Sequence, residues 1–252
     1  MNRLGFGGWT ILVLAGLFFG VPLVMTAAFS LWEGGDRYGF AAYPILWASP
    51  KLFEAMALSA ELAVATVAAL IVLLVPAMIF MNLYAPKLRG LFEFIANLPF
   101  VVPAIALVAG MSALITGPEW LTGTPFYLVI PYFFLALPYA FRSIDVGIRA
   151  IDLPTLTEAG QSLGAGMGQI VLLVVLPSLR SALVGSTLLT LAVVFGEFTF
   201  GNVLLFHTYA VYINELGQHE VTGAAALSVA SFVITWLAML GVMFAGRGKT
   251  AK

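Results

Sequence analysis

Few side chains in this 252-residue chain could support acid–base, nucleophilic or metal chemistry. The chain has no cysteine, and its two histidines are His207 and His219, the second followed directly by Glu220. A hydrolytic site needs a nucleophile beside a base, or metal ligands within reach of one another, and these residues provide neither. A glycine-rich phosphate loop ending in Lys and Ser or Thr is also absent from the sequence. We therefore expect no catalytic residues, no metal site and no cofactor in this chain.

Glu197 is the most unusual ionisable residue, because it lies inside a long apolar run. A carboxylate within a membrane is costly unless it is paired or faces water. One expectation is that Glu197, with Thr199 and Asn202, forms a polar lining of a translocation path, where a carboxylate would attract a cation. The alternatives are a hydrogen bond between helices, a gate residue, or a helix that breaks at Gly196 and leaves Glu197 near the membrane surface.

Asn97 is a further candidate for the substrate path, since it opens the segment Asn97-Leu-Pro-Phe-Val-Val-Pro103. Each proline removes a backbone donor, which lipid cannot replace. We expect this segment to open a helix where it lines a cavity or a moving seam. The alternative is an ordinary kink against a neighbouring helix.

The elements that position these residues follow from the apolar composition: 62% of residues are hydrophobic and 9% are charged, against roughly 25% charged in soluble domains. The apolar runs are continuous and do not alternate, which favours helices over strands. At about 20 residues per span, we expect six transmembrane helices, near residues 9–31, 62–84, 94–116, 126–141, 182–206 and 224–245. The expected fold class is an all-α polytopic membrane protein, with one domain over residues 1–252.

The distribution of charge predicts the orientation of these helices. Nine of the eleven basic residues fall on one side of the expected topology, namely Arg3, Lys87, Arg89, Arg142, Arg149, Arg180, Arg247, Lys249 and Lys252. Arg37 and Lys51 fall on the other side. By the positive-inside rule, both termini and the connection 142–180 face the cytoplasm. The net charge of -1 gives no support for nucleic-acid binding.

The connection 142–180 contains a predicted short helix from about Thr155 to Leu163. Thr155 and Glu158 have the spacing of a capping box, and Pro154 is tolerated in a first turn. Gly164 and Gly166 provide stop signals.

One side of this short helix is apolar, because Leu156, Ala159 and Leu163 recur at helical spacing. Such a stripe needs a surface to rest on. That surface could be the helix bundle itself, the lipid interface or another protein, and the pattern alone leaves the three open.

The same segment resembles the EAA signature of ABC importer permeases. It reads Glu158-Ala159-Gly160, three residues, Gly164, nine residues, Val174, one residue, Leu176-Pro177. The family pattern has Ala at the position of Gly160 and Ile at that of Val174. The resemblance extends loosely over the six expected spans and is to permease subunits of type I importers.

This resemblance implies that the segment is a coupling helix, which sits in a groove of a separate ATPase. The residues implied in ATPase coupling are Thr155, Leu156, Glu158, Ala159, Gly160, Leu163, Gly164, Leu176 and Pro177. It also implies an ABC ATPase dimer that holds ATP and magnesium, a second permease subunit, alike or different, and a periplasmic or extracellular substrate-binding protein. The setting would be the lipid bilayer of a bacterial inner membrane.

The substrate class is suggested by Ser162-Leu163-Gly164-Ala165 and by Leu137–Arg142 before the loop. Both resemble permeases for polyamines, sulfate or molybdate, iron and thiamine, and differ from sugar permeases. We expect a polyamine of the spermidine/putrescine type. An ion-coupled secondary transporter is the alternative class, but it would typically show repeat symmetry and several ionisable residues within the membrane.

Overall fold

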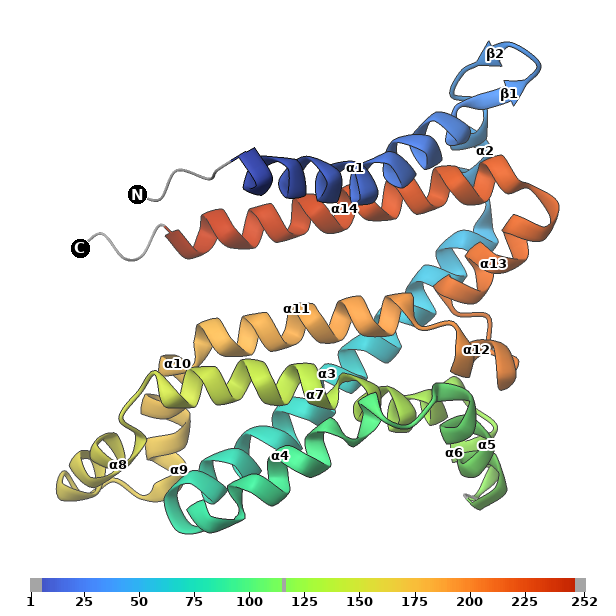
Figure 1. Cartoon of the computed structure of the whole chain (residues 1–252). Helices are drawn as coiled ribbons and strands as arrows, with labels where there is room; N and C mark the ends of the chain where they lie inside the picture. Colours follow the sequence, from blue (N-terminus) through green and yellow to red (C-terminus); the bar gives the residue numbers. More distant parts are fainter. Residues whose placement is uncertain (1–5, 115–116, 248–252) are drawn as a thin grey trace. The chain divides into compact units, whose positions relative to one another are not determined.

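The computed structural model describes residues 6–114 and 117–247 (Figure 1). Arg3, Lys249 and Lys252 of the basic set, and residues 115–116 of the expected third span, lie outside the described residues. The protein is 84% helical. By contacts it divides into two compact units, one made of the chain up to Phe53 with the chain from Tyr212, and one made of Glu54–Val211.

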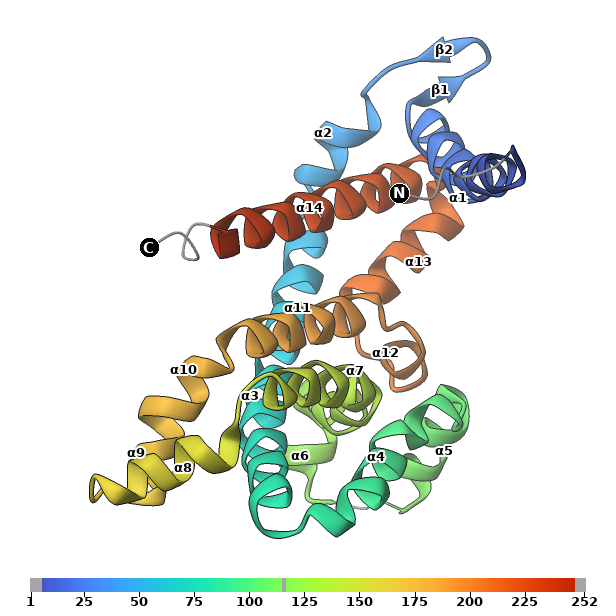
Figure 2. The same cartoon turned by 60° about the vertical axis from the view of Figure 1, so that its left-hand side comes forward.

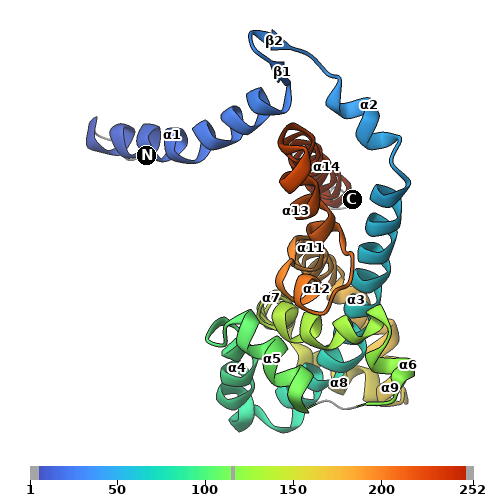
Figure 3. The same ribbon diagram turned by 90° about the vertical axis from the view of Figure 1, so that its right-hand side faces the viewer.

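The first unit holds the two ends of the chain. Its elements are α1 (Phe6–Ser30), β1 (Trp32–Gly34), β2 (Arg37–Tyr38), α2 (Ala42–Trp47), the start of α3 (Pro50–Tyr84), most of α13 (Tyr209–His219) and α14 (Val221–Arg247). α1 and α14 lie side by side (Figure 1). β1 and β2 form a small antiparallel hairpin, whose turn uses the positive φ of Gly34 and Gly35. Figure 3 follows the chain from α1 through this hairpin and α2 into α3.

The second unit contains the remaining helices. They are most of α3, the 3-10 turn η1 (Pro86–Leu88), α4 (Arg89–Asn97), the 3-10 turn η2 (Leu98–Phe100), α5 (Ala104–Leu114), α6 (Glu119–Thr122), the 3-10 turn η3 (Pro125–Leu128), α7 (Val129–Arg149), α8 (Leu153–Ser162), α9 (Met167–Ile170), the π-helical turn η4 (Val171–Val175), α10 (Leu176–Ser178), α11 (Arg180–Gly196) and α12 (Thr199–Val203).

Four helical segments of the described chain are long and apolar enough to cross a membrane. They are Gly7–Ser30, Pro50–Tyr84, Pro125–Arg149 and Arg180–Val203, and the pair Pro86–Phe100 and Ala104–Ala113 makes a fifth if it counts as one bent span. The expectation of an all-α membrane protein is therefore confirmed. The sixth expected span lies within α14, whose described apolar stretch is Val221–Leu237.

The helix expected over residues 94–116 is not continuous. It breaks between α4 and α5, and the two halves are bent by 98°. The cause lies in the sequence, since Pro99 and Pro103 both lack the amide that would continue an α-helical ladder. The break that we expected at Asn97–Pro103 is therefore present.

The core of the second unit forms where α11 packs along α7, as Figures 1 and 2 both show. The approach is close because a Cβ added to Gly147 of α7 would lie 2.4 Å from the Cβ of Ala182 on α11. Ser143 also donates a hydrogen bond to the Ala182 carbonyl at 2.8 Å. Small residues that let two helix backbones approach are typical of helix contacts in membranes. This contact fixes α7 and α11, the two helices that flank the connection containing α8.

Candidate functional site

The connection from α7 to α11 carries the candidate coupling helix α8, which lies with α9 and α10 at one end of the second unit (Figure 2). Asp152 is its N-cap. The Asp152 carboxylate accepts hydrogen bonds from the Thr155 amide at 3.3 Å and from the Thr155 hydroxyl at 2.7 Å. These bonds, first that from the Thr155 hydroxyl and then that from its amide, lower the pKa of Asp152.

The expected capping box of Thr155 and Glu158 is wrong. Asp152 lies three residues before Thr155 and caps the helix itself, so α8 begins at Leu153, earlier than expected. Asp is a better N-cap than Thr. Pro154 falls in the first turn, where its missing amide costs no hydrogen bond within the helix.

The end of α8 agrees with the sequence expectation at Gly164. This glycine has a φ of +80°, a left-handed conformation that residues with a Cβ adopt at a cost. Its amide donates to the Gln161 carbonyl at 2.9 Å, and the next amide, of Ala165, donates to the Gly160 carbonyl at 3.1 Å. Together these two bonds form a Schellman motif. Gly166, expected as a second stop signal, is instead the N-cap of α9. The Gln169 side chain accepts a hydrogen bond from the Gly166 amide at 3.0 Å.

One face of α8 fastens the helix to the rest of the second unit. Leu153 and Thr157 are buried, and Gly160 lies one turn further along the same face. A Cβ at Gly160 would lie 2.7 Å from Cγ1 of Ile170, a core residue that is 1% exposed. Glycine at this position therefore allows α8 to pack directly against the end of α9.

A flanking face of α8, about a quarter turn from the buried one, carries the expected apolar stripe and is largely uncovered. Leu156 is half-buried, Ala159 and Glu158 are exposed, and the Leu163 side chain is 88% exposed. Beside Leu163 is an open groove of about 420 Å³. It is lined by Gly160, Leu163, Gly164, Ala165, Gln169, Ile170, Leu173 and Val174. Among the residues that the structure describes, the helix bundle therefore does not cover Leu163, the last residue of the stripe.

The last two residues of the signature lie where the chain turns from α9 into α11. η4 is π-helical over Val171–Val175, directly before Leu176 and Pro177. Pro177 has no amide to donate back along the helix, and π-helical turns often accompany such interruptions. Leu176 is half-buried against the core of the second unit and Pro177 is exposed. The sequence signature therefore runs from an exposed helix to the packed base of α11.

An ion-pair cluster lies close to α8 and was missed by the sequence reasoning. Asp145 of α7, whose side chain is 9% exposed, pairs with Arg89 of α4 and, at 2.9 Å, with Arg149 one turn further on. Arg89 also donates to Asn82 of α3 at 3.4 Å. The cluster joins α3, α4 and α7 a few residues before α8. The available signal was Asp145, four residues before Arg149 in a largely apolar helix.

Glu197 lies between α11, which ends at Gly196, and α12. The break that we considered as an alternative is therefore present. Both carboxylate oxygens are used within the chain: one accepts the Thr199 amide at 2.7 Å and the other accepts the Phe200 amide at 3.0 Å. Glu197 is 7% exposed. In the single chain it therefore acts as a buried cap for α12.

The other candidates for the substrate path are more accessible. Asn202 is exposed and Thr199 is half-buried, and both lie on α12. Asn97 donates to the Glu93 carbonyl of its own helix at 2.6 Å. Within the described ranges, no hydrogen bond joins Asn97 to Glu197, so the structure brings together Glu197 and Thr199 but does not link them to Asn97.

Groups of three or more potential metal ligands are absent from the described part of the chain. Comparison of the sequence with models of known families gives no match, and comparison with curated protein sequences gives none either. The function must therefore be argued from the residues of the α7–α11 connection.

Proposed function

We propose that this chain is a membrane-spanning subunit of an ATP-driven ABC importer of type I, and that a separate ATPase docks on α8. The observation that carries the proposal is the two-sided character of α8. One face is fixed to the core through Leu153, Thr157 and the close contact of Gly160 with Ile170. The rest of the helix surface presents Leu163, Ala159 and Glu158 to the surroundings.

This arrangement suits the transmission of force. Exposed apolar side chains beside a groove are typical of protein interaction sites. A helix capped at both ends, by Asp152 and by the Schellman motif at Gly164, holds its shape when a partner pushes on it. The same helix is joined to α7 by a short connection and to α11 through α9 and α10. Movement of α8 would therefore be passed directly to α7 and α11, the two helices that pack together in the core of the second unit.

The membrane topology that we propose has six spans, with both termini and the α8 connection in the cytoplasm of a bacterium. It rests on the excess of basic residues on one side of the six apolar runs. α14 serves as the sixth span and the bent pair α4–α5 as the third. The intact importer would contain a second permease subunit, an ABC ATPase dimer with ATP and magnesium, and an external substrate-binding protein, with this chain forming half of the path.

We propose a polyamine as substrate. The support is the resemblance of Ser162-Leu163-Gly164-Ala165 to permeases of the spermidine/putrescine group. That resemblance also covers permeases for sulfate or molybdate, iron and thiamine. A ligand screen on the copurified substrate-binding protein distinguishes these classes, and uptake driven by an ion gradient without ATP would favour a secondary transporter.

The docking proposal can be tested by site-specific photocrosslinking in native membranes. A photoreactive phenylalanine at position 163 should crosslink to a soluble ATP-binding protein. Position 205 is the matched control, because Leu205 is another leucine with a highly exposed side chain, 83%, but lies between α12 and α13. Crosslinking to an ATP-binding protein from both positions, or from neither, would contradict docking on α8.

A further inference from the structure

The chain between β2 and α3 has the composition of a membrane surface element. Residues 38–50 contain no Asp, Glu, Lys or Arg, but they include Tyr38, Phe40, Tyr43 and Trp47. Charged residues lie on both sides, with Asp36 and Arg37 in the hairpin and Lys51 at the start of α3. Exposed apolar side chains that gather in one segment typically mark a protein or membrane interaction site, so the aromatic residues need an explanation.

Large side chains of this segment point away from the first unit. The exposed fraction is 70% for Phe40, 63% for Ile45 and 43% for Trp47. On the other side of α2, Leu46 is 4% exposed and α2 packs against α14. The segment therefore has a defined inner face, and its outer face is apolar and aromatic.

Hydrogen bonds hold this segment in place. The hydroxyls of Ser30 and Tyr43 lie 2.9 Å apart, which ties α2 to the end of α1. The Glu33 carboxylate accepts the Ala41 amide at 3.1 Å, which ties the hairpin to the start of α2. These hydrogen bonds therefore hold the segment in the conformation that exposes its outer face.

The helix that precedes the hairpin, α1, has a surface suited to lipid. α1 ends at Ser30, and no residue in its most apolar stretch is buried. The rings of Phe29 and Trp32 stack at 5.9 Å across the end of this helix, and those of Trp47 and Phe53 lie 6.3 Å apart where α2 leads into α3. Trp and Tyr concentrate where hydrocarbon meets the headgroups. The Phe29–Trp32 pair marks that level at the carboxyl end of α1.

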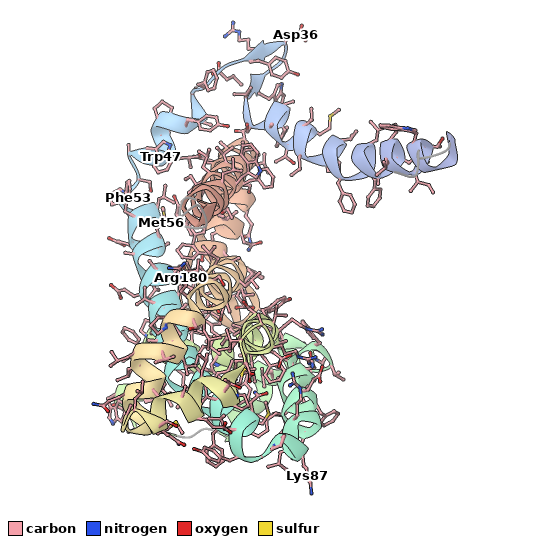
Figure 4. The ribbon with its side chains drawn as sticks, turned by 90° about the vertical axis from the view of Figure 1, so that its left-hand side faces the viewer. Asp36, Trp47, Phe53, Met56, Lys87 and Arg180 are labelled. Atoms are coloured by element: carbon pink, nitrogen blue, oxygen red, sulfur yellow. The ribbon has the colours of Figure 1, made fainter. Side chains whose placement is uncertain are left out.

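We propose that residues 38–49 lie in the interface between the bilayer and water, with Phe40, Ile45 and Trp47 inserted among the phospholipids. The hairpin turn at Asp36 projects into water. Figure 4 labels Asp36 at the hairpin and Trp47 and Phe53 along α2 and the start of α3, so the charged and aromatic positions are separated along the chain. The partner of this face is phospholipid, and the inference is independent of the proposed ATPase.

Spin labelling tests this placement without background substitutions, because the chain has no cysteine. The full chain carrying Ile45→Cys is labelled with a nitroxide and reconstituted in phosphatidylcholine vesicles. Collision of the label with oxygen, which concentrates in lipid, is compared with collision with a water-soluble nickel chelate. Two matched variants set the scale, Leu17→Cys on exposed α1 for the lipid interior and Asp36→Cys for water.

We expect the oxygen-to-nickel collision ratio at Ile45→Cys to lie between the two references and to be several-fold higher than at Asp36→Cys. A ratio equal to that at Asp36→Cys would place the segment in water and overturn the proposal. Low collision with both reagents would show that protein covers the face, and would overturn it as well. A variant that keeps Trp47 and lacks the other four tryptophans gives a second measurement at a native side chain. Its fluorescence in vesicles with brominated acyl chains is expected to be quenched.

Discussion

Arg89 of α4 donates a hydrogen bond to the buried carboxylate of Asp145 on α7, and so connects the broken third helix to the helix that leads into α8. Arg149 donates to the second carboxylate oxygen of Asp145. Because the Arg89 side chain is 30% exposed and that of Arg149 is 59% exposed, the two ion pairs lie in different surroundings. The Arg89 pair is the one that joins separate helices.

Removing Arg89 should leave the buried carboxylate of Asp145 without its partner from α4. We expect Arg89→Ala to lower the free energy of unfolding by about 1.5–3 kcal/mol, the range for a hydrogen bond to a charged group, because Asp145 keeps its bond from Arg149. Arg149→Ala is the matched control and should cost about 0.5 kcal/mol or less, as exposed pairs within a helix do. Thermal unfolding of the detergent-solubilised variants measures both. Equal losses in the two variants would contradict a special role for the pair between helices.

Gly160→Ala would give this chain the residue that the EAA signature has at this position. We expect it to disturb the packing of α8, because the new Cβ would lie 2.7 Å from Cγ1 of Ile170. Overpacking of this kind typically costs about 1–3 kcal/mol. Ile170→Ala removes the obstructing atoms, so the double variant should be more stable than the sum of the two single losses predicts. Strict additivity in a double-mutant cycle would show that the two residues do not touch.

Much of the helical framework could be predicted from the sequence, because the bilayer makes apolar length informative. The expected span 62–84 lies inside α3, and the break after Asn97 was visible in the prolines. The stop at Gly164 was also predicted correctly. These features depend on local chemistry, which a single sequence contains.

Features that depend on competing or distant partners were predicted poorly. The capping-box spacing of Thr155 and Glu158 predicts a cap at Thr155, but Asp152, three residues earlier, is the stronger acceptor and caps α8. Asp145 was missed because its main partner, Arg89, is 56 residues away in the chain. The packing of α2 was not expected either, since its inner face is defined by α14 at the other end of the sequence.

Thermal stability should fall more when Glu197 loses both of its carboxylate oxygens, as in Glu197→Ala, than when it loses only its charge, as in Glu197→Gln. Glu197→Gln keeps one side-chain oxygen to accept an amide of α12, whereas Glu197→Ala leaves the amides of Thr199 and Phe200 without their acceptors. A buried donor without a partner costs about 1–3 kcal/mol, so the alanine variant should unfold at a lower temperature than the glutamine variant.

Transport assays on the same residues separate the cap from a role in the path. Asn202 is exposed on α12 and makes no side-chain hydrogen bond among the described residues. If α12 lines the path, Asn202→Ala should change uptake while leaving thermal stability within about 0.5 kcal/mol. Glu197→Gln should weaken uptake while the complex still assembles. Normal uptake by both variants across a pH series would remove α12 from the path.

The cap at Asp152 gives α8 a defined dependence on pH. Because the pKa of Asp152 is lowered in the folded state, its stabilising effect is fully present above the ordinary pKa of an aspartate. The effect is lost as the pH falls through the lowered pKa. Hydrogen exchange at the α8 amides, corrected for the intrinsic pH dependence, should therefore show full protection at neutral pH and a loss only below the ordinary pKa of an aspartate. In Asp152→Asn this acid step should disappear, and its persistence would assign it to another group.

Glu158 provides a direct test of coupling, because its side chain is exposed on the free face of α8 and makes no contact that the fold needs among the described residues. Charge reversal by Glu158→Arg should therefore leave the stability of the solubilised chain unchanged, within the ±0.5 kcal/mol typical of surface substitutions. If an ATPase docks on α8 as proposed, the same change should weaken binding of that ATPase or allow ATP hydrolysis without uptake. Gly164→Leu is the complementary variant. There, a bulky side chain at φ +80° strains the end of α8 itself, and both stability and coupling should fall. Coupled uptake at the wild-type rate in Glu158→Arg and Gly164→Leu would remove the mechanical role of α8, whereas loss confined to Gly164→Leu would assign that role to the shape of the helix and not to its exposed charge.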